Sequence, residues 1–148
     1  MLPLGIDMGK IERIAQLYPV LMRVMGRIRS TVHDGMDLSY NQYKMLLTIY
    51  DKGNCPLNVL AAELNIAMSS ASEMVDRLVH LGLVCRTVDD ANRRRVLIYT
   101  TAAGEELIRD IRRGIVSNYR ILLEKLPDED QERLVGALET ITEILGKL

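Results

Sequence analysis

The spacing of apolar residues changes in the middle of the chain, and this change constrains the fold more than any other feature. Within 57–65 and 68–81 the apolar residues recur at steps of three and four, which predicts two short amphipathic helices. Two runs rich in β-branched residues follow, 83–88 and 95–100. A polar turn separates these runs, so the pattern predicts a β-hairpin.

Helix, short turn, helix and hairpin in this order describe a winged helix–turn–helix. The major groove of B-DNA is about 12 Å wide and admits one α-helix, which the preceding helix braces. A hairpin beside the pair reaches the adjacent minor groove, where the negative potential attracts arginine. The order of elements therefore predicts a mainly α fold of the α+β class, with a small β-hairpin wing beside a DNA-binding helix pair.

Long amphipathic stretches flank this part of the chain. From Ile6 to about Val32 the apolar steps of three and four predict a helix of about 25 residues. At ~1.5 Å per residue such a helix is about 38 Å long, too long for the core of a compact monomer to cover. Pro19 lies inside the stretch and predicts a kink or a break. Two further helices are expected, from about Ala102 to Leu126 and from Pro127 onward.

Local signals mark where several elements begin and end. Ser39 followed by Gln42 matches a capping box and predicts a helix start. Gly53 is expected to end that helix, and Pro56 to occupy the first position of the next one. Thr101 is expected to cap the helix that follows the hairpin.

The charge of the chain is nearly balanced, but its distribution is uneven. The 19 Lys+Arg and 20 Asp+Glu residues give a net charge of −1, so bulk charge does not indicate a nucleic-acid partner. Residues 1–103 hold a net +2 and residues 104–148 a net −3. The densest basic spot is Arg93–Arg95, with Arg86 just before it. A local basic spot on a neutral protein can still attract DNA.

Several classes of protein are excluded by what the sequence lacks. No apolar run approaches the ~18 residues of a membrane span, and Met1–Lys10 shows no secretory signal. Cys55 and Cys85 fit neither a disulfide framework nor a zinc spacing, which favours reduced thiols in a cytoplasmic protein. His33 and His80 stand alone, so we expect no metal site. Without a nucleotide-binding or nucleophile motif, we predict neither a cofactor nor an enzyme.

A set of short motifs places the chain close to a known family. They are Leu60-Ala61, Val75-Asp76-Arg77-Leu78, Gly82-Leu83-Val84 with Arg86, Asp89 with Arg93-Arg94, and Thr101 with Gly104. In these motifs, and over about residues 38–107, the sequence resembles the MarR family of transcriptional regulators. The resemblance implies a homodimer with the terminal helices at its interface. It also implies a repressor that leaves DNA when a small, often phenolic or aromatic, effector molecule binds.

The resemblance and the order of elements together predict the organisation of the chain. Residues 35–101 are expected to form the winged helix–turn–helix DNA-binding domain. Residues 1–34 and 102–148 are expected to form the helical dimerisation region. Two recognition helices would then enter successive major grooves about 34 Å apart, so double-stranded DNA with an inverted-repeat operator is the expected partner.

The candidate DNA-binding residues lie at two places. Four belong to the start of the second short helix, where side chains meet phosphates and base edges; they are Ser69, Ser70, Ser72 and Glu73. Glu73 would either accept a hydrogen bond from cytosine or repel phosphate. Arg93 and Arg94 are expected on DNA at the tip of the wing. Asp76 and Arg77 are expected to tie the helix to the wing through structural ion pairs.

The resemblance also implies a ligand pocket in the crevice between the winged domain and the dimerisation helices. The candidate residues on or near the faces that would line it are Tyr18, Met22, Arg23, Tyr43 and Met45. Methionine suits adaptable pockets, although a row of such residues is also typical of a core.

Two alternative functions remain open at this point. Glu73, Asn92 in place of the Asp usual before the paired arginines of the family, and the net charge of −1 favour a winged-helix protein-interaction module without DNA binding. The two cysteines raise the second alternative, a thiol-based redox regulator. That alternative is weakened because the first long helix, where the family's peroxide sensors keep their reactive cysteine, contains none.

Overall fold

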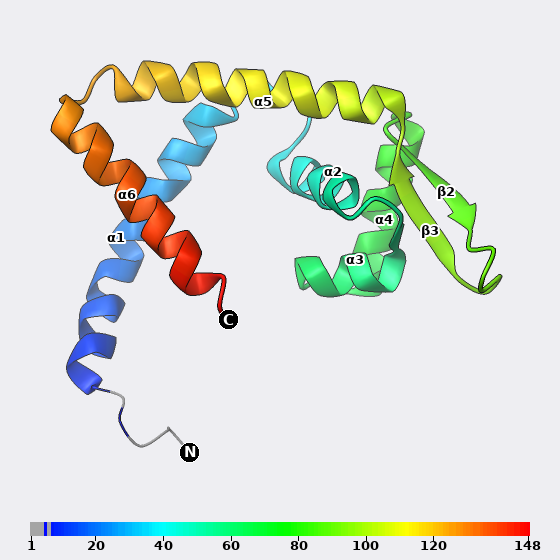
Figure 1. The fold of residues 1–148 in the computed structure, drawn as a ribbon, viewed down its shortest axis with the longest axis horizontal. Coiled ribbons are helices and arrows are strands. Elements are labelled where there is room, and N and C mark those ends of the chain that lie inside the picture. The colour runs from blue at the N-terminus through cyan, green and yellow to red at the C-terminus, as the bar shows by residue number, and fades with distance from the viewer. Residues whose placement is uncertain (1–4, 6) are drawn as a thin grey trace. The chain divides into compact units, whose positions relative to one another are not determined.

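A computed structural model of the chain describes residue 5 and residues 7–148. The start expected at Ile6 for the first helix, and residues 1–4 of the expected dimerisation region, lie outside the described residues. Figure 1 shows the succession of helices and strands, which have the following bounds: α1 Met8–Val32, α2 Tyr40–Lys52, β1 Cys55–Pro56, α3 Leu57–Leu64, α4 Met68–His80, β2 Val84–Val88, β3 Val96–Thr100, α5 Ala102–Leu123 and α6 Asp128–Leu145. The chain divides into two compact units, Gly35–Val116 and a unit made of Met1–Asp34 with Ser117–Leu148.

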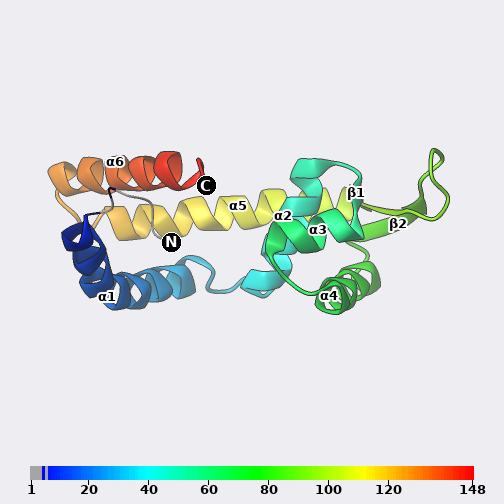
Figure 2. The same ribbon diagram turned by 90° about the horizontal axis from the view of Figure 1, so that it is seen from below.

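The unit Gly35–Val116 contains the helix pair and the hairpin, and the prediction of a mainly α fold with a hairpin wing is confirmed. Strands β2 and β3 pair antiparallel with Cys85 opposite Tyr99, and the loop between them extends away from the helices (Figure 2). The sheet has one more strand than the two predicted, because β1 pairs with β3 on its other side. Pro56 therefore lies in β1 and forms the N-cap of α3, one position before the one we expected.

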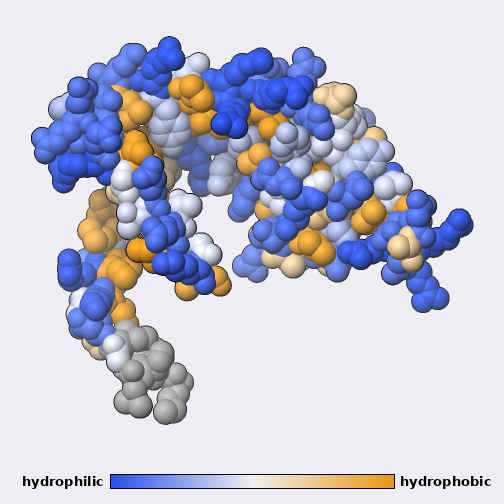
Figure 3. Space-filling view, in the orientation of Figure 1, coloured by the Kyte–Doolittle hydropathy of each residue, from blue (hydrophilic) through white to orange (hydrophobic). Residues whose placement is uncertain are grey.

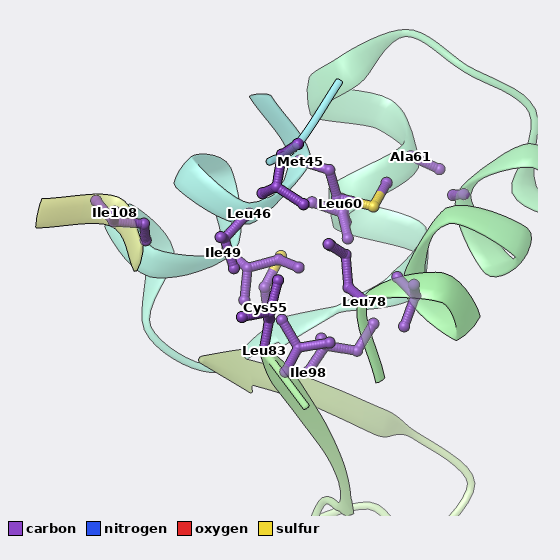
Figure 4. Packing of buried hydrophobic residues seen from close by; sticks show 14 of the residues in the cluster. Met45, Leu46, Ile49, Cys55, Leu60, Ala61, Leu78, Leu83, Ile98 and Ile108 are labelled. Carbon is purple, nitrogen blue, oxygen red and sulfur yellow. The ribbon is translucent and has the colours of Figure 1, made fainter. Parts of the chain in front are cut away.

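An aliphatic core holds this unit together, and Figure 4 shows its side chains converging from the helices and the sheet. The chain has no Phe and no Trp, so methionine and branched aliphatic residues fill the space. The largest fully buried residues are Met45, Leu46, Ile49, Cys55, Leu60, Val75, Leu78, Val84 and Ile98. Because these residues come from α2, α3, α4 and the sheet, burying them fixes the helix pair against the wing.

The caps predicted from the sequence form as expected. The Ser39 hydroxyl accepts a hydrogen bond from the Gln42 amide at 3.2 Å, and the Gln42 side chain accepts one from the Ser39 amide at 3.0 Å. Gly53 ends α2 at φ 73°. Asn65 ends α3 in the left-handed conformation at φ 51°, which makes the tight turn into α4.

The hairpin is fastened to the start of α5 through Thr101. The Thr101 amide donates to the Leu83 carbonyl at 3.0 Å, and its hydroxyl donates to the Gly82 carbonyl at 2.7 Å. The same hydroxyl accepts from the Gly104 amide at 3.1 Å, as the expected cap would. These bonds hold the first strand of the wing against the first turn of α5.

The other unit contains α1, the end of α5 and α6. α1 continues through Pro19, so the predicted break does not occur. The Asn118 side chain donates to the Val32 carbonyl at 2.7 Å and satisfies the C-terminal end of α1. α5 ends at Leu123 rather than at the expected Leu126, and the Gln131 amide group donates to the carbonyls of both residues, at 2.9 and 3.0 Å. In the described part of the chain, no helix has both the length and the apolarity needed to cross a bilayer.

Candidate nucleic-acid interface

The exposed face of α4 carries the first group of candidate residues. Ala71, Val75 and Leu78 are fully buried and turn one side of the helix into the core. At 3.6 residues per turn, Glu73 then lies on the opposite side, and it is exposed. Ser69 and Ser70 are exposed in the first turn, whereas Ser72 is half-buried beside the core stripe.

The N-terminus of α4 presents its backbone without a side-chain cap. Ala67 occupies the N-cap position and supplies no hydrogen bond to the helix. No acidic residue lies in the first turn. The first amide groups of a helix carry a partial positive charge and have no partner within the helix, so this end favours an anion. Ser69 and Ser70 add hydroxyl groups at the same end.

The tip of the wing is an ordered loop, held by its own hydrogen bonds. The Asp89 amide donates to the Arg95 carbonyl at 2.9 Å, and the Asp89 carboxylate accepts from the Ala91 amide at 3.0 Å. The Asn92 side-chain oxygen accepts from the Arg94 amide at 3.2 Å. An aspartate would accept the same bond, so Asn92 preserves the turn while removing a negative charge from the tip.

The arginines of the wing are exposed and carry unneutralised charge. Arg93 and Arg94 form the turn itself, and Arg95 immediately precedes β3. None of the three forms an ion pair with any residue that the structure describes. Charges of this kind interact with phosphate at little desolvation cost.

A surface groove joins the wing to the start of the helix pair. It has a volume of about 590 Å³ and is lined by Leu57, Asn58, Met68, Asn92, Arg94, Arg95 and Val96. Sequence reasoning missed Asn58 and Met68, which lie in the first turns of α3 and α4 and come beside the wing only through the fold. Of the candidate DNA-binding residues, only Arg94 lines the groove, which brings it beside Met68, the first residue of α4.

An ion pair links α4 to the wing beside this surface. The carboxylate of Asp76 accepts a hydrogen bond from the guanidinium of Arg86 on β2. Both side chains are exposed, so the pair contributes only about 0–1 kcal/mol to stability. Arg77, the other residue expected in such a pair, is exposed and has no ion-pair partner among the described residues. The pair sets the position of Arg86 and neutralises Asp76.

The candidate ligand contacts divide between the two units. Tyr18, Met22 and Arg23 are exposed on α1. Tyr43 on α2 is half-buried; burial raises the pKa of its hydroxyl, and the nearby charge of Asp51 raises it further. Met45 is fully buried within the core of its unit, so it contributes to packing there.

The thiols differ in their surroundings. Cys55 is buried in the core, and burial raises the pKa of its thiol. A raised pKa lowers the fraction of reactive thiolate, which disfavours a redox role for Cys55. Cys85 is half-buried on β2. Within the described part of the chain, no group of three or more His, Cys, Asp or Glu residues is arranged to hold a metal ion.

Comparison with known proteins agrees with this geometry. The family model described as "MarR family" matches residues 38–96. The chain is 30% identical over 97 residues to the uncharacterized HTH-type transcriptional regulator YhbI of Bacillus subtilis, covering 66% of this chain and 63% of that protein, which is less than two thirds of its length. It is 28% identical over 123 residues to YsmB, another uncharacterized HTH-type transcriptional regulator of that species, covering 81% of this chain and 84% of YsmB.

Solved structures show the same fold. The structure of Rv1404 from Mycobacterium tuberculosis is similar with a TM-score of 0.77 and 25% identity, over 92% of this chain and 94% of that chain. The apo form of wild-type MarR from E. coli is similar with a TM-score of 0.70 and 20% identity, over 95% of this chain and 98% of that chain.

Proposed function

We propose that the chain, which matches the MarR family model over residues 38–96, is a homodimeric regulator of transcription that binds double-stranded DNA. The observation that carries the proposal is the groove that brings Arg94 of the wing beside Met68 at the start of α4, a helix whose exposed face carries Ser69, Ser70 and Glu73. α4 would enter the major groove, and Arg93 and Arg94 would contact the phosphates and minor groove beside it. Asp76 and Arg86 would keep the wing in register with the helix.

The apolar faces of α1 and α6 support the homodimer. Ile14 and Leu17 on α1 are 65% and 64% exposed, and Ile141 and Ile144 on α6 are 44% and 54% exposed. α6 has no buried residue at all within the described structure. Figure 3 shows apolar surface along α1. Covering one large apolar side chain is worth about 1.5–3 kcal/mol, so a second copy of these helices is the partner that best removes this surface from water.

Two copies would hold two α4 helices at a fixed separation. Successive major grooves on one side of B-DNA are about 34 Å apart, and a two-fold axis between the copies demands an inverted-repeat operator. We propose that occupancy of this operator represses transcription. A role on DNA also agrees with the cytoplasmic location expected from the sequence.

A small effector molecule, such as a phenol or another aromatic compound, would release the protein from DNA. The match to the MarR family supports this step, and the candidate contacts are the exposed Tyr18, Met22 and Arg23 and the half-buried Tyr43. The effector need only bind better to a conformation whose α4 separation does not match DNA. A coupling of about 1–3 kcal/mol changes DNA affinity about 5- to 150-fold.

The test of DNA binding is the salt dependence of affinity for duplex DNA. Arg94→Ala should weaken binding to all sequences and reduce the slope of log K against log salt by about one unit for each protomer. Arg113→Ala is the matched control, because Arg113 is an exposed arginine on α5 outside the candidate surface. An unchanged slope in Arg94→Ala would refute the wing contact. No binding by the wild type even at ~50 mM salt would refute DNA binding and favour a protein-interaction module.

A further inference from the structure

The exposed side of α4 carries two carboxylates, of which one is in an ion pair and the other is not. Asp76 is neutralised by Arg86. Glu73 has no ion-pair partner among the residues that the structure describes, although Arg77 lies one turn further along the helix. Glu73 is exposed, and its backbone position lies opposite the buried stripe of Ala71 and Val75.

The position of Glu73 directs it to bases rather than to phosphates. A helix lying in the major groove turns the middle of its exposed face to the groove floor and its flanks to the two backbones. Ser69 and Arg77 lie one turn before and after Glu73 on the same face, each about 6 Å away along the axis. Glu73 is thus at the centre of the row of side chains that would reach the base edges of a bound duplex.

A carboxylate at the groove floor has few acceptable partners. It only accepts hydrogen bonds, and it is repelled by the surrounding phosphates. In the major groove, the amino groups of cytosine N4 and adenine N6 are the base donors. Adenine also presents the N7 acceptor beside its amino group, which repels a carboxylate, whereas cytosine presents no acceptor there.

We propose that Glu73 determines base specificity by accepting a hydrogen bond from the N4 amino group of one cytosine in each operator half-site. This inference rests on the proposed binding of α4 in the major groove. The negative charge lowers affinity for sequences without that cytosine, because the carboxylate would then be desolvated without a donor. Glu73 therefore lowers affinity for DNA in general and increases the discrimination between the operator and other sequences.

Selection of bound duplexes from a random pool by the full chain tests the inference. The wild type should enrich an inverted repeat with a C·G pair at one equivalent position of each half-site. Glu73→Gln should change that position to adenine, because a carboxamide both accepts from N6 and donates to N7. Glu73→Ala should lose the preference there. Glu139→Gln, which removes one exposed charge from α6, should select the wild-type operator.

Affinity measurements on the selected operator give the size of the effect. Replacing the cytosine pair should weaken wild-type binding about tenfold or more for each half-site, and Glu73→Ala should be nearly indifferent to the replacement. If Glu73→Gln and Glu73→Ala select the wild-type operator unchanged, the assignment of Glu73 is wrong while DNA binding stands. If the wild type selects no duplex, the proposed function fails and the assignment of Glu73 with it.

Discussion

Replacing Gly104 with alanine should destabilise the junction between the wing and α5. A Cβ atom at this position would lie 2.2 Å from the Leu83 carbonyl oxygen and 3.1 Å from its carbonyl carbon. That oxygen already accepts the hydrogen bond of the Thr101 amide. The backbone of β2 or α5 must therefore move, and the movement strains or breaks this bond.

The size of the destabilisation follows from two costs and one gain in free energy. Overpacking costs about 1–3 kcal/mol, and losing the hydrogen bond costs about 0.5–1.5 kcal/mol. Alanine in place of glycine within a helix recovers up to about 1 kcal/mol. We expect Gly104→Ala to lower the free energy of unfolding by about 1–3 kcal/mol. For a chain of this size Tm would fall by about 2–4 °C for each kcal/mol.

Urea unfolding at one fixed protein concentration measures the effect, because dimerisation makes stability depend on concentration. Gly114→Ala is the control in the same helix. Its added Cβ would meet only the Met36 side chain at 3.9 Å, an ordinary contact. We expect Gly114→Ala to be neutral or stabilising by up to about 1 kcal/mol. A Gly104→Ala variant as stable as Gly114→Ala would refute the close approach of α5 to Leu83.

Four further predictions follow from the caps, the apolar faces and the thiols. Ser39→Ala should lower the free energy of unfolding by about 1 kcal/mol in urea titrations, because it removes half of the capping box. Ile141→Glu should yield a monomer by light scattering at micromolar concentration, and a persistent dimer would remove α6 from the interface. Iodoacetamide should label Cys85 before Cys55 in the folded protein at pH of about 8. Because the pKa of Cys55 is raised above its ordinary 9.0, its contribution to stability should fall as the pH rises past that value, which pH-dependent unfolding measures.

Local signals predicted much of the fold because their causes lie within a few residues. The Ser39 capping box and the helix end at Gly53 are set by side-chain and backbone geometry that the sequence shows directly. β1 was missed because two residues, one of them proline, carry no strand pattern, and only the partner strand β3 defines them. Pro19 was expected to kink or break α1, and no break occurs, since Met8–Val32 is one continuous helix.

The candidate site was predictable in its residue types but not in its pairings. Sequence placed Arg86 near the basic spot and Asp76 on the recognition helix, and only the fold shows that the two join. The role of Asn92 depends on a bond to the Arg94 amide that the residue type alone does not specify. Large apolar side chains of α1 and α6 are exposed, and this shows that these two helices need a partner. The spacing of apolar residues in the sequence does not show by itself which helices are left uncovered.

Methylation protection of guanine N7 on a selected operator tests the central claim most directly, because N7 lies in the major groove. Two copies of α4 reading DNA predict two protected patches about 34 Å apart on one face of the duplex, related by the inverted repeat. Protection confined to one patch would contradict the dimer. Binding that leaves every guanine N7 reactive, with contacts in the minor groove alone, would contradict α4 as the recognition helix.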